Sequence, residues 1–128
     1  MMPAGGGIVR VRGGELLIGT CTALADGGLL LSEENVVGIE NCLGVVAMPA
    51  GAVSPEAVKH ETSEVMYVAA GCGELRTDEG VVAVSVGDAI FIPTDAWHWL
   101  ANTGESDLVS VFTFPRPSRP TSYRRPMA

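Results

Sequence analysis

Short apolar runs separated by turn-forming residues are the feature that most constrains the fold of this 128-residue chain. Runs of Val, Ile, Leu and aromatic residues recur between Gly, Pro, Asn or Asp, and no long segment shows a helical period. The runs predict strands at 8–12, 15–23, 28–31, 35–40, 43–48, 64–70, 73–76, 81–85, 89–92, 97–101 and 107–114. Strands this short and numerous predict an all-β fold, either a sandwich or a barrel.

Two proline-rich segments interrupt this pattern. Only the last few residues of 49–60 suit a strand, so we expect this segment to arch over one mouth of a barrel. Residues 115–128 contain four prolines and four arginines, a composition that does not suit a sheet and favours an extended arm. This segment is either a disordered tail or an arm that docks on the acidic body of the same or a neighbouring subunit.

Length and charge limit the class of protein. The chain suffices for one hydrophobic core, which predicts a single domain at 1–114 followed by the tail at 115–128. Residues 1–114 carry four basic and fifteen acidic side chains, a net charge of −11, so we expect no nucleic-acid partner. No run approaches the roughly 20 apolar residues of a membrane helix, and the first residues do not resemble a signal peptide. A soluble cytoplasmic protein without a membrane partner is the simplest interpretation.

Both histidines of the chain stand beside predicted strands. His98 opens a strand that follows a proline turn, and alternation along this strand places His98 and Leu100 on one face and Trp97 and Trp99 on the other. We therefore expect the tryptophans to pack away from His98, under another sheet or at a dimer seam.

The second histidine, His60, lies four residues before Glu64. Alternation places Glu64, Met66 and Val68 on one face of the strand at 64–70. A carboxylate that begins an otherwise apolar face is costly to bury alone. Glu64 is therefore expected to have a cation or a hydrogen-bond donor as its partner.

These two segments resemble the two motifs of the cupin superfamily. Residues 87–102 match the second motif, G(x)5PxG(x)2H(x)3N, except that Asp95 stands where the motif has its second Gly. Residues 58–71 resemble the first motif, HxH(x)3E(x)6G, with Val58 in place of the first His. The matching positions are Gly87, Pro93, His98 and Asn102 in the second motif and His60, Glu64 and Gly71 in the first. The resemblance implies a double-stranded β-helix, the cupin or jelly-roll barrel, with a motif-bearing core at 43–114.

The resemblance also implies a metal centre. Cupins with both complete motifs commonly hold iron, manganese, nickel, zinc or copper with three His and one Glu. This chain keeps His60, Glu64 and His98 as metal ligands, a two-His-one-carboxylate set that suits Fe2+ first and Mn2+, Ni2+ or Zn2+ as alternatives. The other interpretation is that Val58 marks the decay of the site and leaves a metal-free pocket for an organic ligand.

Apolar residues on the faces of these ligands predict the wall of a pocket. They are Val58, Met66, Val68 and Leu100. A mostly apolar pocket suits a small organic molecule. Because Arg76 is the only arginine near the motifs outside the tail, a multiply charged phosphate substrate is disfavoured.

Two functions stay open on this basis. The first is a metal-dependent enzyme in which Glu64 or a metal-bound water moves a proton, with dioxygenase chemistry slightly preferred over isomerase, lyase or cyclase chemistry, all known among cupins. The second is a non-catalytic module that binds or senses a metabolite. The acidic body, outward tryptophans and basic tail favour a homodimer.

Overall fold

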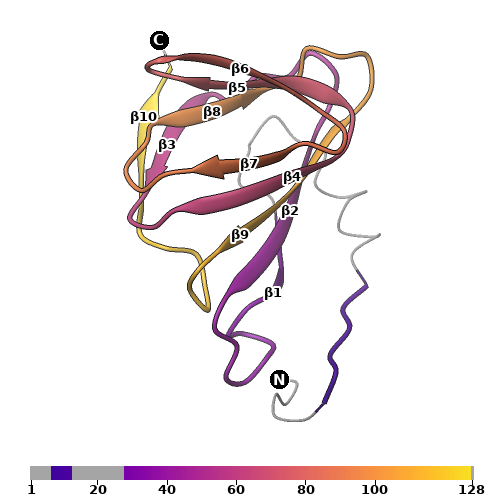
Figure 1. The fold of residues 1–128 in the computed structure, drawn as a ribbon, viewed down its shortest axis with the longest axis vertical. Helices are drawn as coiled ribbons and strands as arrows, with labels where there is room; N and C mark the ends of the chain where they lie inside the picture. Colours follow the sequence, from indigo (N-terminus) through magenta and orange to yellow (C-terminus); the bar gives the residue numbers. More distant parts are fainter. Residues whose placement is uncertain (1–6, 13–27, 128) are drawn as a thin grey trace.

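A computed structural model describes residues 7–12 and 28–127, and its fold is shown in Figure 1. Ten strands and no helix occur in these residues. The strands are β1 (Gly28–Leu31), β2 (Cys42–Met48), β3 (Glu56–His60), β4 (Glu64–Ala70), β5 (Cys72–Thr77), β6 (Gly80–Ser85), β7 (Ala89–Ile92), β8 (His98–Ala101), β9 (Leu108–Phe114) and β10 (Ser122–Pro126). In the part of the chain described, nothing forms a helix able to cross a membrane.

The strands form two antiparallel sheets of five (Figure 1). One sheet has the order β1-β2-β9-β4-β7, and the other has the order β10-β3-β8-β5-β6. Buried residues alternate with exposed ones along β4 and with half-buried ones along β9, as expected for strands with one face on a core. Buried apolar side chains of both sheets pack into one cluster, so the sheets face each other as in a jelly-roll barrel.

Most of the predicted strands are confirmed, and the exceptions have local causes. The strands predicted from residue 43 onward and the one at 28–31 all appear with small shifts at their ends. The segment 15–23 lies outside the described residues. The strand predicted at 8–12 is wrong, and Ile8 there is fully exposed.

The strand predicted at 35–40 is also wrong, because side chains at its first residue and just before it bind the backbone. Asn35 accepts a hydrogen bond from the Ser32 amide at 3.0 Å and donates one to the Leu30 carbonyl at 2.8 Å. The Ser32 hydroxyl accepts a further bond from the Glu34 amide at 3.2 Å. Such local bonds compete with a strand ladder and hold this segment in turns.

The C-terminal tail contradicts the expectation that its composition does not suit a sheet. Residues 122–126 form β10, which pairs antiparallel with β3 from Ser122↔His60 to Pro126↔Glu56. Proline is tolerated here because β10 is an edge strand, which needs backbone donors on one side only. Of the two possibilities for this tail, the structure shows an arm that docks on its own chain. As predicted, the last residues of 49–60 form the partner strand, β3.

Ion pairs hold this arm against the acidic body. Arg125 pairs with Asp78 in the β5–β6 turn through two contacts, at 2.6 and 3.1 Å. Arg124 lies 3.4 Å from Glu56 of β3. Each pair is exposed, so it contributes modestly to stability and mainly fixes the register of β10 on β3.

Gly71, the last residue of the first motif, has a conformation and a setting that exclude a side chain. Its φ is 81°, and a Cβ at this position would collide with the backbone of Asp107. Gly51 has nearly the same φ, 78°, but an added Cβ there meets no atom within 4 Å. A comparison of substitutions at the two glycines therefore distinguishes the cost of backbone strain from the cost of steric collision.

We expect Gly71→Ala to lower the free energy of unfolding more than Gly51→Ala does. Both substitutions force Ala into the left-handed region at a cost of about 1 to 2 kcal/mol. Only Gly71→Ala adds a collision with backbone, which costs roughly 1 to 3 kcal/mol more. Urea unfolding followed by circular dichroism measures both values, and equal losses would contradict this account of the β4–β5 turn.

Candidate metal centre

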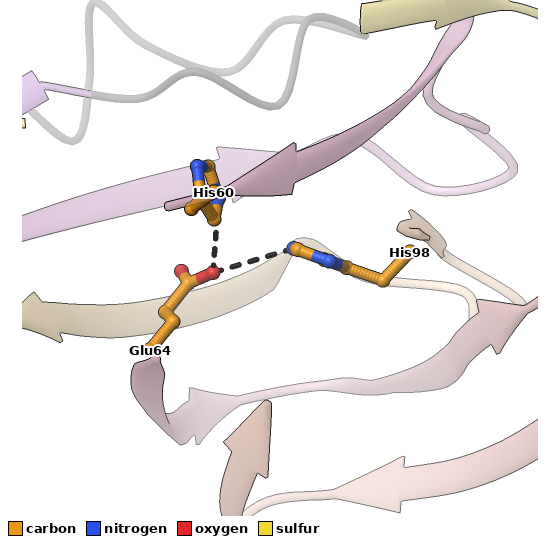
Figure 2. A group of neighbouring side chains, drawn as sticks. All are labelled: His60, Glu64 and His98. Atoms are coloured by element: carbon orange, nitrogen blue, oxygen red, sulfur yellow. Dashed lines mark ion pairs between the residues drawn. The ribbon is translucent and has the colours of Figure 1, made fainter. Parts of the chain in front are cut away.

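His60, Glu64 and His98 come together between the two sheets (Figure 2). His60 ends β3, Glu64 begins β4 and His98 begins β8. The three-residue corner at 61–63 carries the chain from one sheet to the other, which turns His60 and Glu64 toward each other. The Nε2 atoms of the two histidines each lie 3.3 Å from Glu64 Oε1, and all three side chains are at most 10% exposed.

Hydrogen bonds on the outer sides of both imidazoles determine where their protons lie. His98 Nδ1 is 2.8 Å from the carbonyl oxygen of Ala96, which can only accept, so this nitrogen carries a proton. His60 Nδ1 is 2.6 Å from Ser122 Oγ, whose own proton is donated to the Pro120 carbonyl at 3.0 Å. For neutral rings, these contacts favour the tautomer with the proton on Nδ1, which leaves the lone pair of each Nε2 facing Glu64.

Three electron-pair donors thus converge on one buried point. Glu64 Oε1 is buried and receives no hydrogen bond from any residue in the ranges 7–12 and 28–127. An unpaired buried carboxylate beside two lone pairs is unfavourable unless a positive charge lies between them. That charge is either protons on the imidazoles or a metal cation in their place.

The ionisation of Glu64 agrees with this requirement. Burial is the largest single influence on the pKa of Glu64 and raises it. In their charged form His60 and His98 carry a proton on Nε2, and their hydrogen bonding and positive charge together lower it by more, so the pKa lies below its ordinary value. The carboxylate is therefore ionised and available to a cation.

The spacing of the donor atoms fits a metal ion. Two nitrogen or oxygen ligands that are each about 2.1 Å from one ion lie roughly 3 Å apart when they are at right angles. The two separations of 3.3 Å are close to this value, and all the donor atoms lie within 4.8 Å of one another. Imidazole and carboxylate are ligands that suit divalent transition metals.

A cavity of about 380 Å³ lies beside the three residues. Its apolar lining comes from both sheets, and its polar lining comes largely from β3 and the C-terminal arm. The lining residues are Val46, Ser54, Pro55, Glu56, Val58, His60, Glu64, Met66, His98, Trp99, Leu100, Phe112, Phe114, Arg119, Pro120, Ser122 and Arg124. Its size and mainly apolar wall suit a small organic molecule.

Of the four residues expected on the pocket wall, Val58, Met66 and Leu100 line the cavity. Val68 does not. It is fully buried in the apolar core two residues farther along β4 than Met66, so it leaves the same face of the strand but beyond the cavity.

The two tryptophans differ in their relation to the cavity. Trp97 lies outside it, with the charged ends of Lys59 and Arg125 over its ring at 5.1 and 4.7 Å. Trp99 lines the cavity, contrary to the expectation that both tryptophans pack away from His98. Strand alternation predicts on which face of the sheet a side chain lies, but it does not predict how far a cavity extends around that strand.

The C-terminal arm contributes to this cavity, which was not predicted from the sequence. Arg119 and Arg124 line it, and the Arg119 guanidinium lies 5.0 Å from the centre of the Phe112 ring. The expectation that a multiply charged phosphate substrate is disfavoured rested on arginines outside the tail, and both of these cations lie in the tail. Four arginines in the last residues of an otherwise acidic chain were the signal that could have located them.

Two other residues of the second motif have structural roles. The buried Asn102 side chain donates hydrogen bonds to the carbonyl oxygens of Met48 and Ser106, each at 2.9 Å, and accepts one from the Gly104 amide. Asp95 has a φ of 63°, a left-handed conformation that Asp tolerates better than most residues. The turn before β8 therefore keeps its left-handed residue although the motif glycine is absent.

Comparison with known proteins agrees with this architecture. A family model described as a cupin domain matches residues 44–114. A double-stranded β-helix protein from Klebsiella pneumoniae is similar over 81% of this chain and 86% of its own, with 14% identity and a TM-score of 0.67. The polyketide cyclase RemF from Streptomyces resistomycificus is similar over 78% and 70%, with 22% identity and a TM-score of 0.65.

A putative sugar phosphate isomerase from Acidithiobacillus ferrooxidans is a further structural neighbour. It has 25% identity and a TM-score of 0.54, over 61% of this chain and 51% of its own. The chain thus spans about half the length of that protein. No protein with a curated description matches the sequence. At these identities the structural neighbours establish the fold alone.

Proposed function

The chain belongs to the cupin domain family, and on that premise we propose that it is a metal-dependent enzyme acting on a small organic molecule. The observation that carries the proposal is the meeting of three electron-pair donors at one buried point. Glu64 Oε1 lies 3.3 Å from two imidazole nitrogens and receives no hydrogen bond from the described residues. A cavity beside this point offers room for a substrate.

His60, Glu64 and His98 are the proposed ligands, with Fe2+ preferred and Mn2+, Ni2+ or Zn2+ as alternatives. A bound metal would supply a Lewis acid that polarises a substrate oxygen and, if it is iron, redox chemistry with dioxygen. Because Val58 has no ligating atom, the protein supplies three ligands and leaves coordination positions for other molecules. The two-His-one-carboxylate set supports dioxygenase chemistry as the first choice.

The residues of this chain would have distinct roles toward a substrate. A carboxylate has two oxygens, so Glu64 can hold a cation through one and accept a substrate proton at the other. Met66 and Leu100 present apolar surface that excludes water and strengthens the charges of the site. Arg119 and Arg124 bring positive charge to the cavity, which favours a monoanionic substrate, although Glu56 beside Arg124 opposes a higher negative charge.

Other cupin chemistry stays a second candidate. The polyketide cyclase and the putative sugar phosphate isomerase among the structural neighbours support cyclase or isomerase chemistry in this fold. Because Val58 stands where the first motif has a metal-binding His, a non-catalytic binding module is also supported. A homodimer and a cytoplasmic location stay predictions.

Protein purified without added metal is expected to contain about one equivalent of a divalent transition metal per chain. Glu64→Ala and His98→Ala each remove a ligand, so their metal content should fall at least about tenfold. The measurement is elemental analysis by mass spectrometry on variants whose fold is verified by circular dichroism. Glu105→Gln is the matched control, because Glu105 is exposed, does not line the cavity and should leave the metal content unchanged. Wild-type protein that contains no metal and also resists loading with Fe2+, Mn2+, Ni2+ and Zn2+ would overturn the proposal.

Dioxygenase chemistry predicts oxygen uptake by the Fe2+-loaded protein. A panel of small monocarboxylates and phenols should include a compound that raises oxygen consumption at least about tenfold over the Glu64→Ala protein, because the variant lacks a ligand and a proton acceptor. An oxygen electrode measures the rate. Metal-loaded protein that converts a compound without oxygen uptake would instead favour cyclase or isomerase chemistry.

Val58→His is expected to tighten metal binding by roughly 10- to 100-fold. Val58 lies on the same face of β3 as His60, is paired with His98 and lines the cavity, so a histidine there can reach the same point. Competition with a chromogenic chelator measures the affinity, and Val58→Ala, which adds no ligand, should leave it nearly unchanged. Unchanged affinity in Val58→His would show that this position does not face the site.

A further inference from the structure

The hydroxyl of Ser122, in the C-terminal arm, contacts the outer nitrogen of His60. We propose that Ser122 is a positioning residue that keeps His60 in the one tautomer and orientation able to bind a cation. The inference rests on the metal site of the proposed function and goes beyond it, because it makes the arm, which lies outside both motifs, a working part of the centre.

Ser122 is the hydrogen-bond acceptor for His60 Nδ1, and this contact fixes the orientation of the imidazole ring. Ser122 and His60 are paired residues of the antiparallel strands β10 and β3. Ser122 Oγ lies 2.6 Å from His60 Nδ1, and its own proton is donated to the Pro120 carbonyl at 3.0 Å. With its proton committed to Pro120, the hydroxyl can only accept from His60. The Nδ1 proton of His60 is thereby fixed, and the lone pair of Nε2 faces Glu64.

Without this acceptor, His60 could place its proton on either nitrogen. A proton on Nε2 would point at Glu64 Oε1, 3.3 Å away, and would occupy the position that a cation needs. Solvent cannot easily replace the serine, since the His60 side chain is only 10% exposed. With the Ser122 hydroxyl present, His60 is protonated on Nδ1 and its Nε2 is free to bind a metal. Without it, His60 can be protonated on Nε2 and donate a hydrogen bond to Glu64 instead.

His98 shows why the role of the arm is specific to His60. The acceptor for His98 Nδ1 is the carbonyl of Ala96, two residues earlier in the same turn, so it forms with the turn itself. The acceptor for His60 comes from 62 residues farther along the chain. Its position depends on the pairing of β10 with β3.

Several contacts keep Ser122 in place. Elsewhere on β10, Arg125 binds Asp78 and the Tyr123 hydroxyl donates to Glu61 at 2.9 Å. The edge of the His60 ring packs against Phe114, with ring centroids 4.8 Å apart, which limits rotation of the imidazole. Because the described residues offer three ligands to the site, a misdirected His60 would leave two of them.

The test uses the full-length chain with Ser122→Ala and Ser122→Thr. Ser122→Ala should weaken Zn2+ and Ni2+ binding by roughly 10- to 100-fold, the usual effect of removing a hydrogen-bond partner of a metal-binding histidine. Ser122→Thr keeps the hydroxyl and should bind metal within about threefold of the wild type. Ser118→Ala, in the same arm but not on the cavity lining, is the matched control and should have wild-type affinity.

A second measurement reads the tautomer directly in metal-free protein. At a pH high enough that each imidazole carries a single proton, nitrogen-15 NMR distinguishes a proton on Nδ1 from one on Nε2. In the wild type both histidines should carry the proton on Nδ1. In Ser122→Ala, His60 should shift toward the Nε2 tautomer while His98 does not change.

The outcomes separate this inference from the proposed function. Wild-type affinity in Ser122→Ala together with an unchanged His60 tautomer would overturn the role of Ser122. Equal losses of affinity in Ser122→Ala and Ser122→Thr would also overturn it, because the hydroxyl would then not be the cause. Wild-type protein that binds no metal would defeat the proposed function, whereas the tautomer of His60 would still decide whether Ser122 controls it.

Discussion

A carboxylate buried between two sheets requires positive charge beside it, and the arrangement of this protein follows from that requirement. Glu64 is 5% exposed and begins a strand whose other inward residues are apolar. Water cannot supply the charge at this depth, so two imidazoles converge on one oxygen of the carboxylate. A divalent cation can bind the carboxylate and both imidazole nitrogens at once. Electrostatics therefore supports a metal at this point independently of the motif.

The barrel provides the rigidity that such a site needs. Each of the three residues stands at the end of a strand, where the backbone is fixed by ladder hydrogen bonds and the side chain projects into the space between the sheets. The same alternation that places Glu64 inward also places Met66 and Val68 inward, and these begin the apolar core. Folding of the core and assembly of the centre are therefore consequences of one strand pattern.

The properties that the sequence predicted well are local ones. Alternation has a period of two, so β4 and β8 could be placed with Glu64 and His98 inward, and motif spacing brought His60 to the same point. The failures depend on partners distant in sequence or on side chains that compete with the backbone. Ser32 and Asn35 turned a predicted strand into turns, and β10 became a strand only because β3 offered it an edge.

The C-terminal arm changes how this cupin should be compared with others. In the motifs the chain has lost a ligand at Val58, which alone would suggest a weakened site. Outside the motifs it has an arm whose arginines bind the acidic body and whose residues Arg119, Pro120 and Ser122 line the cavity. An arm that carries both arginines of the cavity and the partner of His60 can alter the substrate and the metal affinity without any change in the core. In this proposal the motifs supply the centre, and the arm determines what the centre binds.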